Sequence, residues 1–338
     1  MTDVDDPLLE RADATGVDWR ELARDQTDLF RTDMAALEVL APDHYVGATE
    51  AVGLVVDAVE TMLAAGRAYR VPGGDGEPDG DVYFDVRSWP HYGELTRQRV
   101  EDMEPAGDAD PRGKRDPRDF ALWKGAKPGE PATAVWESPW GAGRPGWHLE
   151  CSAMSTKYLG AEFDIHGGGL DLRFPHHENE LAQSAAAGDG FARFWLHNGL
   201  VTYGGEKMSK SVGNTISPEE MLGMARPTAV RYFLGQAHYR SQLDYRPGAL
   251  DEAEAAVERI EGFTARARAA GAVPPAPDGA LADRVPAAFR TAMEDDLNVP
   301  QALAALHEAV RAGKVKAVWI ACTNPVHSMP DIGQVREA

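Results

Sequence analysis

The sequence is poor in cysteine, in long apolar runs and in positive charge. Its two cysteines, Cys151 and Cys322, stand far apart among 338 residues, which argues against a disulfide framework. No apolar run approaches the roughly 20 residues that a membrane-spanning helix needs. The first residues, MTDVDDPLLERAD, are acidic where a signal peptide would be basic and then apolar. These absences predict a soluble, cytoplasmic protein without a membrane partner.

Acidic residues outnumber basic ones, 54 to 34, and give a net charge of −20. Such a charge argues against indiscriminate binding to nucleic acid, although a local basic surface could still hold an RNA. Only eight residues are lysines, so the two lysines of the KMSKS stretch, Lys207 and Lys210, stand out.

Apolar periodicity predicts helices over residues 8–40, broken near Gly16, and over residues 48–66, ending at Gly66. The stretch YRVPGGDGEPDGDVYFDV predicts two short strands around a turn. Residues 101–146 are rich in proline, glycine and charge, which predicts an irregular insertion or a connector packed on a larger domain.

The pattern changes after this insertion. Helix, strand, glycine-rich loop, helix and strand alternate over residues 147–216, which predicts a parallel α/β sheet with ligands at the carboxyl ends of its strands. Residues 218–270 are predicted to be helical, 271–285 to be a linker, and 286–312 to be a helical hairpin or part of one.

The stretch FPHHENELAQSA carries the first candidate site. If Pro175 starts a helix, His176 and Glu180 lie on one face of it. With Cys151 they would give zinc an imidazole, a carboxylate and a thiolate, and a further protein ligand or a substrate would fill the fourth position. His177 is the competing imidazole, about 100° away on the helix. The alternative is a solvated turn with a cysteine that packs as a small hydrophobe.

Two glycine-flanked stretches are further candidates. In DIHGGGLDLRF, the amides of three glycines could hold a phosphate or carboxyl group, with His166 and Asp171 as polar contacts. The alternative is a tight turn. In GGEKMSKSVGN, Lys207 and Lys210 could form a mobile cationic lid over a polyphosphate. The alternative there is a charged surface turn.

Taken together, these stretches resemble a known family. GEKMSKSVGN resembles the KMSKS loop of class I aminoacyl-tRNA synthetases, and GWHLECSAMSTKYLGAEFDIHGGGLDLRFPHHENELAQS resembles the core of cysteinyl-tRNA synthetases. DGDVYFDV, KRDPRDFALWK and DDLNVPQALAALHEAV extend the resemblance over most of residues 80–313. It implies a class I Rossmann-type parallel α/β sheet, a helical C-terminal part and a monomer. It also implies activation of L-cysteine with ATP and Mg²⁺, and transfer of the cysteinyl group to tRNA(Cys).

The resemblance also implies roles for single residues. Cys151, His176 and Glu180 match three of four protein ligands of one Zn²⁺, which selects cysteine over serine by its thiolate. Lys207 and Lys210 match the catalytic lysines of the KMSKS loop, with Lys210 nearer the ATP phosphates. The implied substrate and ATP contacts are Thr2, Trp147 in the amino-acid pocket, His166, Gly167, Gly168 and Gly169 around the adenylate, and Asp171.

Domain roles follow from the same resemblance. Residues 1–217 would be the catalytic domain, 218–270 a stem-contact region, and 286–312 the start of a tRNA-side domain. Family members carry a zinc-binding cysteine and a HIGH motif in a first strand and helix. Neither that motif nor a cysteine before Cys151 occurs here. We therefore expect a chain truncated at the first βα unit, and a non-catalytic zinc-binding fragment is one alternative.

Both ends of the chain differ from that family. Residues 1–80 look closer to the mycothiol-pathway ligase, which joins cysteine to glucosaminyl-inositol and is the second enzymatic alternative. That ligase would carry glutamine at His166 and would lack DDLNVPQALAALH. The tail, residues 313–338, resembles a fragment of nitrate reductases and is assigned no activity. A chimeric reading frame would explain both ends.

Overall fold

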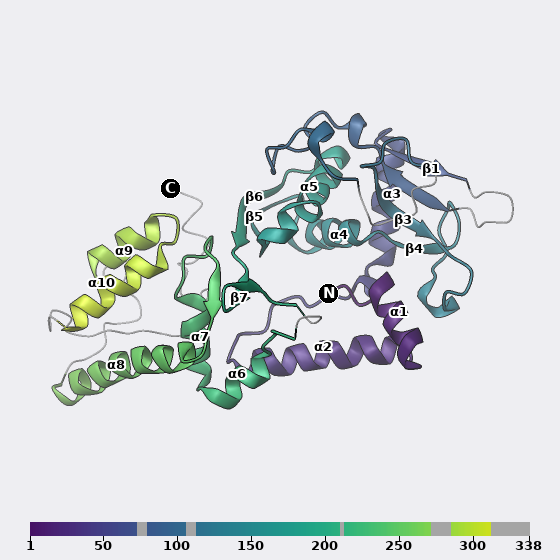
Figure 1. Ribbon diagram of the computed structural model, residues 1–338. Coiled ribbons are helices and arrows are strands. Elements are labelled where there is room, and N and C mark those ends of the chain that lie inside the picture. Colours follow the sequence, from purple (N-terminus) through teal and green to yellow (C-terminus); the bar gives the residue numbers. More distant parts are fainter. Residues whose placement is uncertain (73–79, 106–112, 210–212, 272–284, 312–338) are drawn as a thin grey trace. The chain divides into compact units, whose positions relative to one another are not determined.

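The computed structural model describes residues 1–72, 80–105, 113–209, 213–271 and 285–311 (Figure 1). The predicted tail, most of the predicted linker and Lys210 lie outside these ranges. The chain divides into two compact units, Met1–Asp28 with Pro42–His197, and Leu29–Ala41 with the residues from Asn198 onward. The predicted domain roles stay predictions, because compact units and functional domains need not share boundaries.

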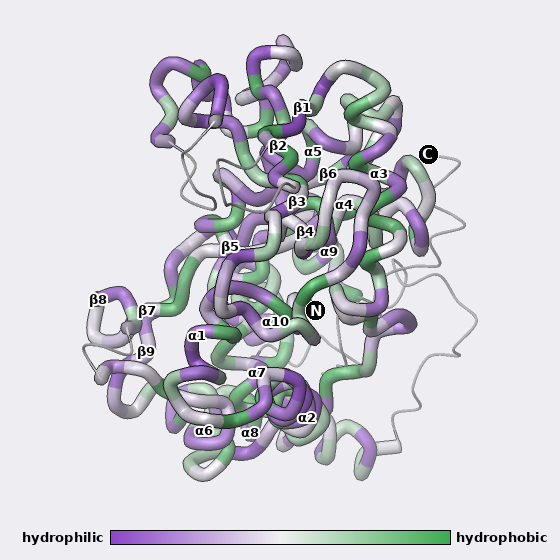
Figure 2. The backbone as a smooth tube through the Cα atoms, turned by 90° about the vertical axis from the view of Figure 1, so that its right-hand side faces the viewer, coloured by the Kyte–Doolittle hydropathy of each residue, from purple (hydrophilic) through white to green (hydrophobic). Residues whose placement is uncertain are grey.

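The first helices follow the predicted periodicity. Asp5 caps α1 (Asp6–Thr15) by accepting a hydrogen bond from the Leu8 amide, and the helix ends at Gly16, whose φ of +68° suits glycine. Helix α2 (Trp19–Ala36) appears mainly in hydrophilic colours in Figure 2, and Trp19 is its buried residue. The prediction of helices broken near Gly16 is therefore confirmed.

Helix α3 lies against the main core of the first unit. After η1 (Ala48–Glu50), α3 (Val52–Ala64) buries four apolar side chains at helical spacing, which are Val52, Val55, Val59 and Met62. Gly66 then turns the chain with a φ of +68°. This confirms the second predicted helix and its end.

An antiparallel sheet packs on α3 and has the strand order β1-β2-β3-β4. Its strands are β1 (Ala68–Val71), β2 (Asp81–Phe84), β3 (Phe120–Gly125) and β4 (Gly143–Pro145). The first two strands confirm the predicted pair. The prediction of an irregular insertion over 101–146 is wrong for β3 and β4, because β3 is a buried inner strand of the sheet. Its short apolar run was missed because the residues around it are rich in proline, glycine and charge.

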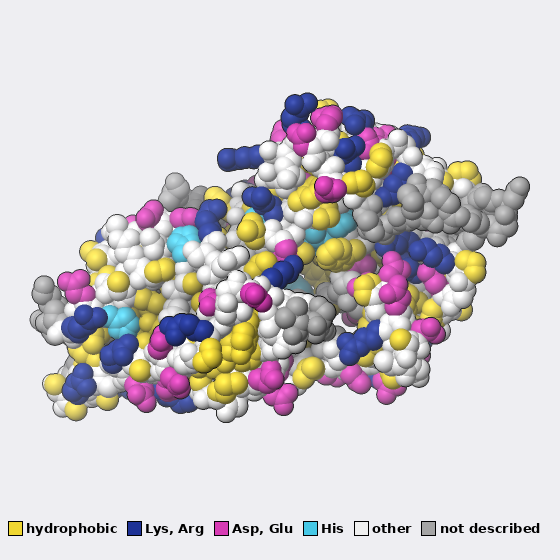
Figure 3. Space-filling model, viewed as in Figure 1, with side chains coloured by type: hydrophobic (Ala, Val, Ile, Leu, Met, Phe, Trp, Pro, Cys, Tyr) yellow, Lys and Arg dark blue, Asp and Glu magenta, His cyan; other side chains and the backbone are white. Residues whose placement is uncertain are grey.

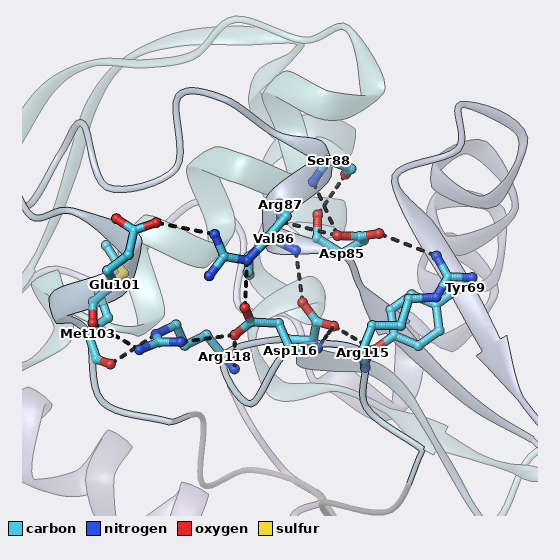
Figure 4. Close-up of polar contacts among 11 residues, drawn as sticks. Tyr69, Asp85, Val86, Arg87, Ser88, Glu101, Met103, Arg115, Asp116 and Arg118 are labelled. Carbon is cyan, nitrogen blue, oxygen red and sulfur yellow. Dashed lines mark hydrogen bonds and ion pairs between the residues drawn. The ribbon is translucent and has the colours of Figure 1, made fainter.

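A buried carboxylate fixes the connections between these strands. Asp119, fully buried, accepts hydrogen bonds from the Tyr69 hydroxyl (2.6 Å) and from the amides of Val86 and Asp116 (both 3.0 Å). Around it, Figure 4 shows the Arg87 guanidinium between Glu101 and Asp116. The short helices η2 (Val86–Ser88) and η3 (Val100–Asp102) lie in these connections, and η4 (Ala132–Ala134) lies between β3 and β4.

The rest of the first unit alternates helix and strand, as predicted from residue 147. Its elements are α4 (Trp147–Leu159), β5 (Glu162–Gly169), η5 (Leu170–Arg173), α5 (His176–Ala187) and β6 (Phe191–Asn198). The Phe191 amide donates to the Ala161 carbonyl where both strands begin, and Gly167 lies against the Leu196 carbonyl further along. The paired strands β5 and β6 therefore run parallel, with α5 connecting them.

The second unit combines a small mixed sheet with helices. Strands β7 (Val201–Tyr203), β8 (Glu206–Lys207) and β9 (Leu243–Tyr245) form the order β8-β7-β9, with β7 and β9 parallel. The helices are α6 (Pro218–Met224), α7 (Pro227–Gly235), α8 (Ala249–Ala269), α9 (Ala287–Glu294) and α10 (Val299–Arg311). The predicted helices and hairpin are present, whereas β9 was missed within 218–270.

The α9–α10 hairpin is tied to the rest of its unit by polar contacts. Asp296, in the hairpin turn, accepts hydrogen bonds from the Tyr239 hydroxyl (2.7 Å) and the Arg240 guanidinium (2.7 Å). In α10, His307 contacts the Tyr232 hydroxyl at 3.1 Å. Asp296 and Leu297 have φ values of 51° and 54°, so these contacts hold a turn that non-glycine residues seldom adopt.

Acidic and basic side chains are interspersed on the face shown in Figure 3. Within the described ranges, no helix is both long enough and apolar enough to cross a bilayer.

Candidate functional site

The predicted ligands Cys151, His176 and Glu180 come together where α4 faces the start of α5. Their ligand atoms all lie within 4.8 Å of one another. His176 and Glu180 are four residues apart on α5, and the His176 Nε2 to Glu180 Oε1 distance is 2.5 Å. Helix α5 begins at His176 with Pro175 just before it. The predicted shared face of His176 and Glu180 is thus present, and the helix begins one residue later than expected.

Glu180 is the centre of this cluster. It is fully buried, and its second oxygen, Oε2, lies 2.6 Å from His166 Nε2. Neither Glu180 oxygen has a hydrogen bond of acceptable geometry. The two imidazoles are therefore close to the carboxylate, but their N–H groups do not point at its oxygens. Burial alone would raise the pKa of Glu180, but His166 and His176 outweigh it and hold this pKa at about 2. The carboxylate is therefore ionised.

This geometry fits a metal ion better than a set of hydrogen bonds. An ionised carboxylate with undirected contacts, an imidazole and a thiol within reach of one point are the donors that zinc takes. Burial and the charges of Glu180 and Glu150 raise the pKa of the Cys151 thiol above its ordinary value. A cation would favour the thiolate and would release the proton.

His148 and Trp147 surround the His176 ring. His148 Nδ1 lies 2.8 Å from His176 Nδ1, which leaves His176 Nε2 turned toward Glu180. Burial, with His176 beside it, lowers the pKa of His148 to about 3, so its ring is neutral. The centre of the Trp147 ring lies 4.3 Å from that of the His176 ring, and Trp147 as a residue is 41% exposed. Trp147 therefore combines contact with the cluster and exposure to solvent, as a pocket wall requires.

A second group of donors shares Glu180. It consists of His166, His177 and Glu180, whose ligand atoms also lie within 4.8 Å of one another. His177 Nδ1 is 2.9 Å from His197 Nε2, so a neighbouring imidazole fixes this ring. His177 is thus the competing imidazole that the sequence predicted, on the other side of the shared carboxylate. His166 contacts Glu180 directly, which its predicted place beside an adenylate does not explain.

The glycine run lies in and at the end of β5. A Cβ on Gly168 would lie 2.8 Å from Cε1 of His177, so glycine is needed there for the close approach of an imidazole. A Cβ on Gly167 would meet only ordinary contacts. Asp171, in η5, is exposed and accessible to a ligand. The predicted contacts of Gly167, Gly168, Gly169 and Asp171 with an adenylate stay predictions.

Thr2 contacts a buried residue that the sequence did not single out. Its hydroxyl donates to Oε2 of Glu150 at 3.3 Å. Glu150 lies in the first turn of α4, just before Cys151, and is 1% exposed. Burial raises the pKa of Glu150 to about 8. A carboxyl group is thus buried one residue from a candidate metal ligand.

Glu178 and Asn179 were also missed, although they stand between His176 and Glu180. Glu178 accepts hydrogen bonds from the Gly93 amide (2.8 Å) and from the Thr96 amide and hydroxyl (2.9 and 3.0 Å). Asn179 Oδ1 accepts from the Tyr92 hydroxyl at 2.5 Å. The helix that carries the metal donors therefore also anchors residues 92–96.

The KMSKS stretch belongs to the second unit. Lys207 is exposed in β8, and its carbonyl accepts a hydrogen bond from Asn214 Nδ2 at 3.1 Å. Asn214 Oδ1 also accepts from the Ser209 amide at 2.8 Å, so one side chain bridges this loop. Lys210, the other predicted catalytic lysine, lies outside the described residues.

Comparison with known proteins gives consistent matches. Residues 1–255 match the family model described as tRNA synthetases class I (C) catalytic domain, and residues 288–315 match the DALR domain. The cysteine–tRNA ligase of Micrococcus luteus is 78% identical over 326 residues, and that of Kocuria rhizophila is 62% identical over 322 residues. These alignments cover 93% and 92% of the chain but 66% of each relative. The chain thus spans about two thirds of the length of these relatives.

Solved structures show the same fold at low identity. The Mycobacterium tuberculosis methionyl-tRNA synthetase in complex with methionyl-adenylate superposes with a TM-score of 0.65 at 18% identity. The match covers 91% of this chain and 72% of that one.

Proposed function

The chain belongs to the class I (C) tRNA synthetase family, and on that premise we propose that it activates L-cysteine with ATP and transfers the cysteinyl group to tRNA(Cys). The observation that carries this proposal is the set of a thiol, an imidazole and an ionised carboxylate around one point. Zinc, held there by Cys151, His176 and Glu180, would bind the substrate thiolate and refuse the harder hydroxyl of serine.

The remaining roles concern ATP and the acceptor. From the resemblance we assign contacts with ATP and its Mg²⁺ to the glycine run at the end of β5. To the lysines Lys207 and Lys210 we assign, separately, the stabilisation of phosphate charge. The reaction would be attack of the cysteine carboxylate on the α-phosphate with loss of pyrophosphate. A hydroxyl at the 3′ end of tRNA then takes the cysteinyl group from the adenylate, and AMP is released. The chain's own contribution is to position these groups and to stabilise charge. We also propose a cytoplasmic monomer.

Pyrophosphate exchange tests activation separately from transfer. The purified chain, with zinc supplied, should incorporate labelled pyrophosphate into ATP when L-cysteine is present and not when L-serine replaces it. Absence of exchange from a folded, zinc-loaded chain would contradict the proposal and would favour the non-catalytic zinc-binding fragment.

The acceptor distinguishes the enzymatic alternative. The resemblance of residues 1–80 to the mycothiol-pathway ligase suggests glucosaminyl-inositol as an acceptor, whereas the DALR match at residues 288–315 supports tRNA. Incubation of the chain with cysteine, ATP and each acceptor in turn should give cysteinyl-tRNA and no amino-sugar product.

A further inference from the structure

Asp244, on β9, connects its strand to the turn that precedes the KMSKS stretch. One carboxylate oxygen, Oδ1, accepts two hydrogen bonds, from the Thr202 hydroxyl at 2.9 Å and from the Gly205 amide at 2.6 Å. Thr202 lies in β7, and Gly205 lies in the turn between β7 and β8. A single side chain of β9 therefore holds both the central strand and the turn that leads to Lys207.

This turn is built from glycine and is attached to β9 at two points. Gly204 and Gly205 have φ values of 59° and 83°, and tight hairpin turns of type I′ require positive φ at both central residues. The Gly204 amide donates a hydrogen bond to the Tyr245 carbonyl at 3.0 Å. The first glycine is thus held by the backbone of β9, and the second by the Asp244 side chain.

The strand register places Asp244 and Lys207 on the same face of the small sheet. Thr202 is paired with Lys207 of β8 on one side and with Asp244 of β9 on the other. Residues that are paired across strands point to the same face, so the three side chains form one row. Leu243 and Tyr245, which flank Asp244, pack in the core of the second unit and therefore use the opposite face.

Strand β8 is short, so these contacts matter for the orientation of Lys207. It has two residues and lies at the edge of the sheet order β8-β7-β9, as Figure 2 also shows. Few ladder hydrogen bonds can hold a strand of this length. On its far side, the Lys207 carbonyl accepts from Asn214 Nδ2 at 3.1 Å. The backbone of Lys207 is thus held by a side chain after it and, through the turn before it, by Asp244.

We propose that Asp244 is a positioning residue for Lys207, because it fixes the turn and the edge strand from which that lysine extends. This inference rests on the proposed function. A lysine stabilises developing phosphate charge only where its ammonium group meets the phosphate, and a misplacement of about 1 Å can cost about a hundredfold in rate. Asp244 would act through the backbone of the turn and would not touch the substrate.

The first test compares two substitutions of Asp244. Asp244→Ala removes the acceptor and should slow cysteine-dependent pyrophosphate exchange roughly tenfold to a hundredfold. Asp244→Asn keeps an acceptor oxygen at the same position and should retain a rate close to that of wild type. Asp25→Ala, at an exposed position on α2, is the control and should leave the rate unchanged. An undiminished rate in Asp244→Ala would overturn the positioning role.

A double-mutant cycle separates positioning of Lys207 from a general loss of structure. If Asp244 acts through Lys207, Asp244→Ala should slow exchange in the wild-type background and have little further effect in Lys207→Ala. A residue that only supports the fold would slow both backgrounds by the same factor. Equal factors in the two backgrounds would therefore overturn the inference.

A second variant keeps the test decisive if Asp244→Ala does not fold. Thr202→Val removes the hydroxyl that holds the carboxylate and keeps the side-chain shape. It should slow exchange by a smaller factor, and only where Lys207 is present; an undiminished rate would again overturn the role. Exchange as fast in Lys207→Ala as in wild type would remove this role alone. Wild-type chain without exchange would remove the proposed function and the role with it.

Discussion

At the scale of the residue, the surroundings of Cys151 decide how readily its thiol loses a proton. It lies near two carboxyl groups, Glu180 and Glu150, and burial with their charges raises its pKa. A cation bound by the thiolate would offset that unfavourable charge, and binding would release a proton. Zinc affinity should therefore increase as the pH rises.

Cys151→Ala tests this residue directly. Loss of a metal ligand should lower zinc affinity by more than the roughly 10- to 100-fold that loss of an outer-shell partner costs. Zinc content by atomic absorption and cysteine affinity by calorimetry should fall together. Cys322→Ala, at the chain's other cysteine, is the matched control and should retain both. Full zinc content in Cys151→Ala would remove this residue from the metal site.

Lys207→Ala tests the exposed lysine of β8. Loss of a positive charge that stabilises the developing phosphate charge should slow pyrophosphate exchange on the order of a hundredfold. Because the side chain is exposed, the unfolding midpoint should not change. Lys157→Ala, at an exposed lysine in the last turn of α4, is the control. An equal exchange rate in both variants would exclude Lys207 from catalysis.

The spacing of His176 and Glu180 predicted that the two side chains share a helix face, and the structure places Cys151 beside them. Their role as metal ligands stays a prediction. The spacing of residues in the sequence shows which side chains share a helix face. The donor atoms of those side chains then limit which ligands they can bind. The hydrogen bonds of Glu150 and Glu178 could not be predicted, because their partners, Thr2 and Thr96, are distant in sequence. A buried acid inside an otherwise polar stretch gives no periodic signal.

At the scale of the element, the helices were predictable and some strands were not. Helices such as α3 repeat their apolar positions over several turns, and a glycine follows soon after the last turn. Strand β3 is only six residues long and is buried on both faces, so it lacks alternation. Strand β9, with three residues, is too short to leave any periodic pattern. Such strands form because their backbones hydrogen-bond to strands that are distant in sequence.

Glu178→Ala should loosen the contact between α5 and residues 92–96. The substitution removes the acceptor of three hydrogen bonds and leaves the Gly93 and Thr96 amides without it, at a cost of about 3 kcal/mol in unfolding free energy. Urea denaturation measures this loss. Glu60→Ala, at an exposed position of α3, should cost far less. Equal losses in the two variants would contradict the anchoring role.

The α9–α10 hairpin should be weakened by acid. Burial, with Arg259 and Arg311 nearby, lowers the pKa of His307 below its ordinary value of 6.5. Below that pH the unfolded chain binds the proton more readily than the folded one, so this contribution to stability is complete above about pH 6.5 and declines as the pH falls. His307→Gln should show a smaller loss of stability between pH 7 and pH 5 than wild type in denaturant titrations. Identical pH profiles would exclude this histidine.

At the scale of the whole molecule, the two compact units differ in chemistry. Both donor clusters found among the described residues lie in the first unit. So do seven of the eight tryptophans, and the eighth, Trp319, lies outside the described ranges. The seven are Trp19, Trp89, Trp123, Trp136, Trp140, Trp147 and Trp195. Tryptophan fluorescence therefore reports mainly on the unit that would bind zinc.

Zinc should stabilise the first unit selectively. A ligand at about 100 times its dissociation constant adds about 2.7 kcal/mol to the stability of the state that binds it. The thermal midpoint followed by fluorescence should rise with zinc more than the midpoint followed by far-ultraviolet circular dichroism, to which the helices of both units contribute. Cys151→Ala should lose this difference. A zinc-induced shift of equal size by both probes would contradict selective stabilisation.

Each of the first five side chains of α5 has a specific contact within the first unit. His176 and Glu180 lie in one donor cluster, His177 packs against His197, and the pair between them holds residues 92–96. Mutational tolerance across this pentapeptide should therefore be close to zero, although its members would fail for different reasons. A substitution that changed the donor cluster here would also risk the fold, so sequence change in this protein should accumulate at residues that surround the pentapeptide.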